Sequence, residues 1–135
     1  MNIHAPARAK HSILIVDDMT VSRQILVMLL ENAGYLDVRT APDAHRAVDE
    51  LSRRLPDLII ADLHMPGISG AEFLRYIRGN ELTWQIPFIL TSGDDTNKAI
   101  DLAWSLGLNK FLPKPFNAEQ LVSAIAQACA RRRVS

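Results

Sequence analysis

Apolar residues fall into two alternating patterns along the chain. Short runs that are apolar at nearly every position alternate with longer stretches in which apolar residues recur every three or four positions. The continuous runs are typical of strands buried on both faces, and the periodic stretches are typical of amphipathic helices. We expect strands in the segments 12–16, 36–41, 57–62, 86–92 and 110–115. We expect helices in the segments 20–34, 42–54, 71–80, 96–107 and 117–133.

In each predicted helix, the recurring apolar residues define a face that we expect to pack on the sheet. From the first helix to the fifth, these residues are Val21, Ile25, Met28 and Leu29; Ala44, Ala47, Val48 and Leu51; Phe73, Leu74 and Ile77; Ala99, Leu102, Ala103 and Leu106; and Leu121, Ile125 and Ala128. Strands and helices alternate five times, so the pattern predicts one α/β domain with a parallel sheet and helices on both of its faces.

Composition sets the limits of this domain and its surroundings. The chain has 135 residues, of which 48% are hydrophobic, so one packed domain over residues 12–130 is expected. Residues 1–11 are expected to form a loose arm, and residues 131–135 a basic tail that either complements its own helix dipole or docks a partner. Fifteen basic residues balance fifteen acidic ones, which argues against bulk attraction to nucleic acid or membrane. A single cysteine, no secretory signal and no membrane-spanning run favour a reducing, cytoplasmic location.

Polar residues that could react or bind a ligand stand at the ends of four predicted strands. The first strand ends at Asp17 and Asp18, the third at Asp62, the fourth at Thr91-Ser92, and the fifth at Lys114. Ligands of a doubly wound sheet bind beyond the carboxyl ends of its strands. We therefore expect three carboxylates, one or two hydroxyl groups and one ammonium group to meet at one edge.

This set of groups favours a divalent cation and a phosphoryl group. Three neighbouring carboxylates repel one another unless a cation compensates them, and an all-oxygen site favours Mg²⁺. Neither a Walker-type loop nor a GxGxxG motif is present, so a nucleotide is not the expected ligand. Phosphoryl transfer onto the protein itself remains, with Asp62 as the candidate nucleophile.

Taken one at a time, each of these residues can also have an ordinary structural role. The acidic pair can cap the following helix, and Asp62 can be a turn residue before Met65-Pro66. Ser92 can be a loop hydroxyl, and Lys114 a solvated surface side chain. The functional interpretation rests on all of them standing at successive strand ends.

With these motifs, the chain resembles the receiver domains of two-component response regulators, and among them the CheY-like chemotaxis regulators. The resemblance covers about residues 12–130 and rests on four features. An acidic pair closes the first strand, and "HMPGISG" follows Asp62. A hydroxyl residue lies thirty positions beyond Asp62, which selects Ser92 over Thr91, and a "KPF" lysine, Lys114, lies fifty-two positions beyond it. The resemblance implies a flavodoxin-like doubly wound (βα)5 fold with strand order 2-1-3-4-5.

The resemblance also assigns the metal ligands and the residue that is phosphorylated. It implies that Asp62 is the phosphoacceptor, and that Asp18 and Asp62 bind Mg²⁺ directly together with the backbone carbonyl of His64. Asp17 is expected to act through a metal-bound water.

Further roles follow from the same resemblance. Ser92 is expected to hydrogen-bond one phosphoryl oxygen and Lys114 to pair with another. Phe111 occupies the aromatic switch position and is expected to move inward with Ser92. The Lys114-Pro115 peptide bond is expected to be cis. His64 and Asp94 occupy the positions that tune dephosphorylation in this family.

Two features of this chain differ from the common pattern or add to it. Gly93 follows Ser92 where alanine is usual, which is expected to loosen the loop. In the segment 96–107, Ile100 and Trp104 lie off the predicted core face. They either fold back over a strand or form an exposed patch for a partner beside Phe111, and we favour the patch.

The implied function is signalling by protein contact rather than turnover of a separate substrate. The expected phosphodonor is a histidine kinase, and the expected target is a flagellar motor switch protein unless the chain serves as a phosphate sink. A monomer or a phosphorylation-dependent dimer is expected, with no nucleic acid and no membrane as partners.

The alternatives are the receiver part of a larger regulator or hybrid kinase, and an aspartyl-phosphate hydrolase. The hydrolases require a DxD motif on the first strand, and "VDDM" does not supply it. A flavin-binding role would require a Ser/Thr-rich phosphate loop after the first strand, which this sequence lacks.

Overall fold

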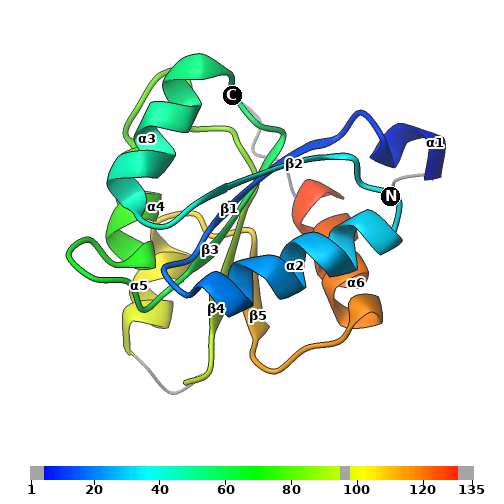
Figure 1. The fold of residues 1–135 in the computed structure, drawn as a ribbon. Helices are drawn as coiled ribbons and strands as arrows, with labels where there is room; N and C mark the ends of the chain where they lie inside the picture. Colours follow the sequence, from blue (N-terminus) through cyan, green and yellow to red (C-terminus); the bar gives the residue numbers. More distant parts are fainter. Residues whose placement is uncertain (1–4, 95–97, 131–135) are drawn as a thin grey trace.

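A computed structural model describes residues 5–94 and 98–130 of the chain, and it contains five parallel strands surrounded by helices (Figure 1). The strands are β1 (Ser12–Val16), β2 (Asp37–Ala41), β3 (Leu58–Asp62), β4 (Phe88–Ser92) and β5 (Lys110–Pro113). The helices are α1 (Ala5–Arg8), α2 (Thr20–Asn32), α3 (Ala44–Arg53), α4 (Gly70–Arg78), α5 (Lys98–Ser105) and α6 (Ala118–Ala130).

The strand order β2-β1-β3-β4-β5 confirms the expected doubly wound sheet. Helices α2 and α6 cover one face of the sheet, and α3, α4 and α5 cover the other (Figure 1). Strand β1 shows why its sequence is apolar without alternation. Leu14 and Val16 pack toward α3, α4 and α5, whereas Ile13 and Ile15 pack toward α2 and α6. A central strand in a parallel sheet is covered on both faces, so every position is apolar.

The predicted core faces of three helices are confirmed. The residues Ala44, Ala47 and Leu51 of α3, Phe73, Leu74 and Ile77 of α4, and Leu121, Ile125 and Ala128 of α6 are buried. Val48 is half-buried and packs against the same core as the other α3 residues. These helices carry polar residues on the opposite side, so the apolar stripe identifies the buried face without ambiguity.

The predicted core face of α2 is wrong for three of its four residues, while Leu29 is half-buried and packs against the core. Val21, Ile25 and Met28 are exposed, with 63%, 46% and 54% of their surface accessible, and Leu26 and Leu30 are buried instead. The six residues 25–30 are all apolar and therefore surround the helix, so periodicity does not distinguish its two sides. As a result, α2 presents an apolar face to solvent.

Helix α5 also corrects a prediction. Ile100, which we expected in an exposed patch, is only 5% accessible and packs in the core with Ala103. Leu102, which we expected in the core, is 41% accessible, while Trp104 is exposed as predicted at 43%. The other predicted core residues hold, because Ala103 is buried and Ala99 and Leu106 pack against the same core. The buried face of α5 therefore includes Ile100 in place of Leu102.

Residues 5–11 do not form the loose arm that we expected. Helix α1 contacts the end of α2: its last residue, Arg8, donates a 3.0 Å hydrogen bond to the carbonyl of Ala33. The Arg8 guanidinium lies 5.7 Å from the centre of the buried Tyr35 ring, and the His11 ring lies 6.0 Å from it. The segment therefore packs on an aromatic side chain of the core. The first four residues of the expected arm and the expected basic tail 131–135 lie outside the described residues.

The described part of the chain contains no helix that is both long enough and apolar enough to cross a lipid bilayer.

Candidate functional site

The carboxyl ends of β1 and β3 bring Asp17 and Asp62 to one edge of the sheet. The backbone of Asp17 follows β1 directly and donates to the carbonyl of Ala41, and its side chain is 1% accessible. Its two carboxylate oxygens accept hydrogen bonds from the backbone N–H of Met19 at 3.0 Å and from the Ser22 hydroxyl at 2.5 Å. Asp17 is therefore fixed in orientation on both sides.

Asp62 ends β3 in a position defined by the start of α4. It is 7% accessible, and one carboxylate oxygen accepts a 3.4 Å hydrogen bond from the backbone N–H of His64. A Cβ atom at Gly70 would overlap the Asp62 carbonyl oxygen, so only glycine permits this close approach of α4 to the strand end. The strand, the turn and the helix start together hold the Asp62 carboxylate at the edge of the sheet.

Lys114 connects the two buried carboxylates. Its ammonium nitrogen lies 3.3 Å from an oxygen of Asp62 and 3.4 Å from an oxygen of Asp17. The peptide bond between Lys114 and Pro115 is cis, as the resemblance implied. Two buried negative charges share one positive charge, so the site keeps an excess of negative charge that a further cation can compensate.

The three aspartates together form a candidate metal centre. Asp17, Asp18 and Asp62 each place one carboxylate oxygen within 4.8 Å of those of the others, and Asp18 is exposed to solvent. Oxygen ligands at this spacing, with one exposed carboxylate for a partly hydrated ion, fit Mg²⁺. The role of the His64 carbonyl as a further ligand stays a prediction.

Burial dominates the electrostatics of Asp62. Desolvation raises the pKa of its carboxyl group above the ordinary value, while the nearby Lys114 ammonium lowers the pKa and the Asp17 carboxylate raises it. A partly desolvated carboxylate is less stable in its ionised form, and this is a common property of residues that react or bind metal.

Ser92 and Asp94 form a local turn at the end of β4. The Ser92 hydroxyl accepts a 3.0 Å hydrogen bond from the backbone N–H of Asp94 and lies 3.3 Å from the Asp94 carbonyl oxygen. Thr91, the other hydroxyl at this strand end, pairs with Asp62 in the sheet register and lies 3.5 Å from the Ala61 carbonyl. The structure thus places Ser92 at the predicted edge, with its hydroxyl engaged by its own loop.

The predicted switch residue Phe111 lies on β5 and is half-buried against the core formed with α3, α4 and α5. Trp104 is on the neighbouring helix, and Ile100 lies beneath the surface in that core. Of the predicted output residues, the structure leaves Trp104 exposed and buries Ile100.

Sequence reasoning missed Ser22. Its hydroxyl contacts both Asp17 and Lys114, at 2.5 Å and 3.5 Å. The signal available in the sequence was its position: Ser22 lies in the first turn of a helix that begins just after the acidic pair, and it is a polar residue beside an apolar stretch.

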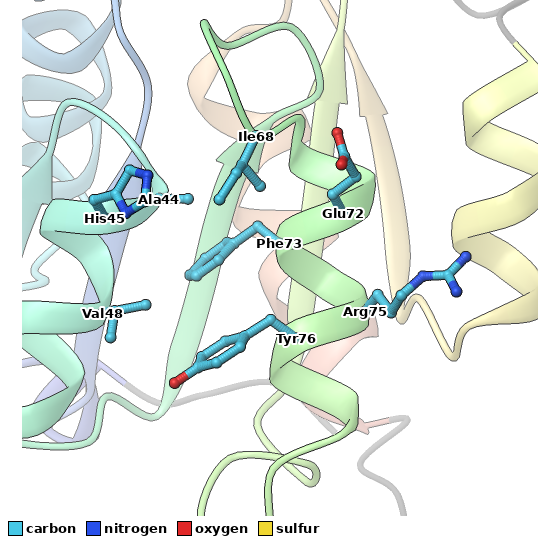
Figure 2. Close-up of a pocket in the computed structure, with 8 residues that line it drawn as sticks. All are labelled: Ala44, His45, Val48, Ile68, Glu72, Phe73, Arg75 and Tyr76. Atoms are coloured by element: carbon cyan, nitrogen blue, oxygen red, sulfur yellow. The ribbon is translucent and has the colours of Figure 1, made fainter.

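A cavity of about 600 Å³ between α3 and α4 lies apart from this site (Figure 2). Phe73 and Tyr76 of α4 point toward α3, where Val48 faces them, whereas Arg75 points away from α3. None of the predicted site residues lines this cavity.

Fold and site together define a flavodoxin-like α/β domain with an acidic, lysine-containing site at the carboxyl edge of its sheet. The chain belongs to the response regulator receiver domain family, whose model matches residues 13–126. It is accordingly a receiver domain of two-component signalling, a class that acts with histidine kinases and downstream effectors.

Two relatives from Pseudomonas aeruginosa illustrate the range of the family. The phosphate regulon transcriptional regulatory protein PhoB is 37% identical, with 90% of this chain and 52% of PhoB covered. The chemotaxis protein CheY is 31% identical, with 88% of this chain and 96% of CheY covered. This chain thus spans about half the length of PhoB and nearly all of CheY.

A solved structure agrees with this assignment. The chemotaxis response regulator CheY4 of Vibrio cholerae superposes with a TM-score of 0.79 at 29% identity, and the match covers 87% of this chain and 97% of CheY4.

Proposed function

We propose that this receiver domain accepts a phosphoryl group from a histidine kinase onto Asp62 in the presence of Mg²⁺ and then signals by contact with another protein. The observation that carries the proposal is the position of Lys114, whose ammonium group bridges Asp17 and Asp62 beside the exposed Asp18. Phosphoryl transfer depends chiefly on positioning and on compensation of charge, and this edge of the sheet supplies both.

The proposed reaction forms an acyl phosphate. A carboxylate oxygen of Asp62 attacks the phosphorus atom of a phosphohistidine. An O–P bond forms while the P–N bond breaks, and the imidazole nitrogen leaves with the bonding electron pair. Lys114 is close enough to Asp62 to pair with one phosphoryl oxygen. Ser92 would donate its hydroxyl hydrogen to a second phosphoryl oxygen in place of the Asp94 carbonyl oxygen.

Asp17, Asp18 and Asp62 are the residues that would hold Mg²⁺, together with the carbonyl of His64. The bound ion would supply positive charge for the phosphoryl oxygens during transfer.

The surface beside the site supports a protein as the phosphodonor. The exposed face of α2 carries Val21, Ile25 and Met28. A cavity of about 370 Å³ adjoins this face and continues to the site, because Ser22, Lys114 and Phe116 are among its lining residues. An apolar surface that leads to the reactive group favours a donor that brings its own apolar side chains.

The output surface is proposed on α5 and β5. Trp104 and Leu102 are exposed on α5, and the half-buried Phe111 on β5 packs against the core cluster that contains Ile100 and Ala103 of α5. Inward movement of Phe111 after phosphorylation would alter this surface, which makes it a site for a downstream partner. His64 and Asp94 flank the site, and we propose that they set the lifetime of the acyl phosphate through access of the attacking water.

A role in chemotaxis is our leading proposal. In this role the protein would either bind a flagellar motor switch protein or serve as a phosphate sink. The match to CheY over nearly its whole length supports it. The alternative is the receiver part of a larger regulator, which the match to half of PhoB supports. The length of the parent reading frame separates the two. The proposal further places the protein in the cytoplasm, as a monomer or a phosphorylation-dependent dimer, without nucleic acid or membrane contacts.

The central claim is tested by incubation with acetyl phosphate and Mg²⁺, followed by intact-mass measurement. We expect one added phosphoryl group in the wild-type protein and in the control Asp49→Asn, which changes an exposed aspartate on α3. We expect no addition in Asp62→Asn or in the presence of a chelator. An unmodified wild-type protein, or a modified Asp62→Asn variant, would contradict the proposal.

A further inference from the structure

Ser22 links the two charged groups that surround Asp62. It lies in the first turn of α2, half-buried, and donates its hydroxyl hydrogen to Asp17 Oδ2 at 2.5 Å. Its oxygen lies 3.5 Å from Nζ of Lys114. A hydroxyl group has one donor and two acceptor sites, so Ser22 can serve the carboxylate and the ammonium at the same time.

The surroundings of Ser22 fix its hydroxyl toward the site. The next residue, Arg23, donates a 2.7 Å hydrogen bond to the backbone carbonyl of Asp17, which ties the start of α2 to the end of β1. The other carboxylate oxygen of Asp17 accepts the N–H of Met19. Each Asp17 oxygen thus has a neutral hydrogen-bond donor, and Oδ2 also faces the ammonium of Lys114.

A phosphoryl group on Asp62 would change this balance. Lys114 now divides its charge between Asp17 and Asp62, at 3.4 Å and 3.3 Å. A dianionic group on Asp62 would draw the ammonium toward it, and the ion pair between Lys114 and Asp17 would weaken. The hydroxyl of Ser22, held by the helix, would stay in place.

We propose that Ser22 is a positioning residue: it keeps the Asp17 carboxylate oriented toward the metal while Lys114 moves to the phosphoryl group. This inference rests on the proposed function. A hydroxyl that only completed the hydrogen bonding of a buried carboxylate would contribute to stability alone. A positioning residue must also change the binding of Mg²⁺.

The test compares three variants of the full chain with the wild type. Ser22→Ala removes the hydroxyl, Ser22→Thr keeps it, and Ser52→Ala is a matched control, since Ser52 is an exposed helical serine that bonds to the carbonyl of Val48. Mg²⁺ binding to the unphosphorylated protein is measured by calorimetry. Phosphorylation by acetyl phosphate is followed over a range of Mg²⁺ concentrations, and thermal unfolding is recorded with chelator.

We expect Ser22→Ala to weaken Mg²⁺ binding about tenfold, since loss of a hydrogen bond that orients an acidic side chain of the metal site has effects of this order. Phosphorylation should slow by a similar factor at limiting Mg²⁺ and recover as Mg²⁺ saturates the site. Ser22→Thr should restore most of the binding, and Ser52→Ala should behave as the wild type.

Unchanged Mg²⁺ binding in Ser22→Ala would overturn the inference and leave the proposed function intact. So would a Ser22→Thr variant that is as impaired as Ser22→Ala, because the hydroxyl would then not be the group that matters. A wild-type protein that neither binds Mg²⁺ nor becomes phosphorylated would overturn the proposed function, and this inference with it.

Discussion

The side-chain hydroxyl of Ser92 accepts a 3.0 Å hydrogen bond from the backbone N–H of Asp94. This contact closes a small turn at the end of β4 and keeps the hydroxyl in its own loop. The hydroxyl hydrogen faces the Asp94 carbonyl oxygen at 3.3 Å, and the oxygens of a phosphoryl group on Asp62 would be stronger, charged acceptors for it. We therefore expect phosphorylation and the conformation of this loop to be coupled through the Ser92 side chain.

Replacement of Ser92 by alanine should slow phosphorylation of Asp62 about tenfold or more, because a hydrogen bond to a charged group contributes roughly 1.5–3 kcal/mol. Intact-mass time courses with acetyl phosphate measure the rate. Ser92→Thr keeps the hydroxyl and should retain a rate close to that of the wild type. Equal rates for the alanine variant and the wild type would show that the hydroxyl does not contact the phosphoryl group.

Replacement of Asp62 by asparagine should stabilise the metal-free protein at neutral pH. Burial raises the pKa of Asp62, so the ionised carboxylate is less favourable in the folded state than in the unfolded state. This destabilisation is absent below the unfolded-state pKa, grows as the pH rises, and is complete above the raised folded-state pKa. Asparagine never incurs it. Thermal unfolding with chelator should give a higher midpoint for Asp62→Asn at neutral pH, with the difference shrinking as acid protonates Asp62.

Addition of Mg²⁺ provides the control for this prediction. The ion should raise the unfolding midpoint of the wild type, because it binds only the folded state, and should raise that of Asp62→Asn much less. A less stable Asp62→Asn variant in chelator would contradict the role of burial at this carboxylate.

The sequence was sufficient to predict the sheet, because short runs that are apolar at every position are typical of strands covered on both faces. It was also sufficient to predict the acidic edge, since the carboxyl ends of parallel strands must meet. Side-chain partners were harder to predict: the link from Ser22 to Asp17 depends on how α2 leaves β1, and a serine in a first helical turn has many possible uses.

The prediction of which helix side is buried failed where apolar residues occur on more than one side of the helix. In α2, the run 25–30 is apolar on every side, and in α5, Ile100 and Leu102 offered two candidate faces. Which apolar side of a helix is buried depends on its contacts with other elements, and a single sequence contains no direct record of those contacts.

Two substitutions in α5 should separate the effect of a core residue on stability from the effect of a surface residue on partner binding. Ile100→Ala should reduce the free energy of unfolding by about 2–5 kcal/mol, since it leaves a cavity in the packed core. Trp104→Ala should cost less stability, because Trp104 is 43% accessible, yet it should weaken binding of the phosphorylated protein to its target. Urea unfolding and calorimetry with a flagellar motor switch protein measure the two effects.

Leu82→Ala is the control for the binding measurement, because Leu82 is an apolar side chain that is 75% accessible and lies in the loop between α4 and β4. It should leave target binding unchanged. If Trp104→Ala slowed phosphorylation as much as it weakened target binding, the patch on α5 would not be a separate output surface.

A pH-dependent ion pair stabilises the amino-terminal edge of β2. Arg54 donates to both carboxylate oxygens of Asp37, at 2.7 Å and 2.9 Å, and this contact lowers the pKa of Asp37. A lowered folded-state pKa means that the pair stabilises the fold fully above the unfolded-state pKa of Asp37. That stabilisation is lost as the pH falls through the lowered pKa. Its size should be modest, since both side chains are partly exposed.

Asp37→Asn should therefore be less stable than the wild type near neutral pH, and the difference should vanish in acid strong enough to protonate Asp37. Arg54→Lys keeps the charge but loses the two-pronged contact, so its stability should fall between the two. Urea unfolding at several pH values measures the difference. A gap between wild type and Asp37→Asn that persists after Asp37 is protonated would mean that packing, rather than the ion pair, accounts for the effect.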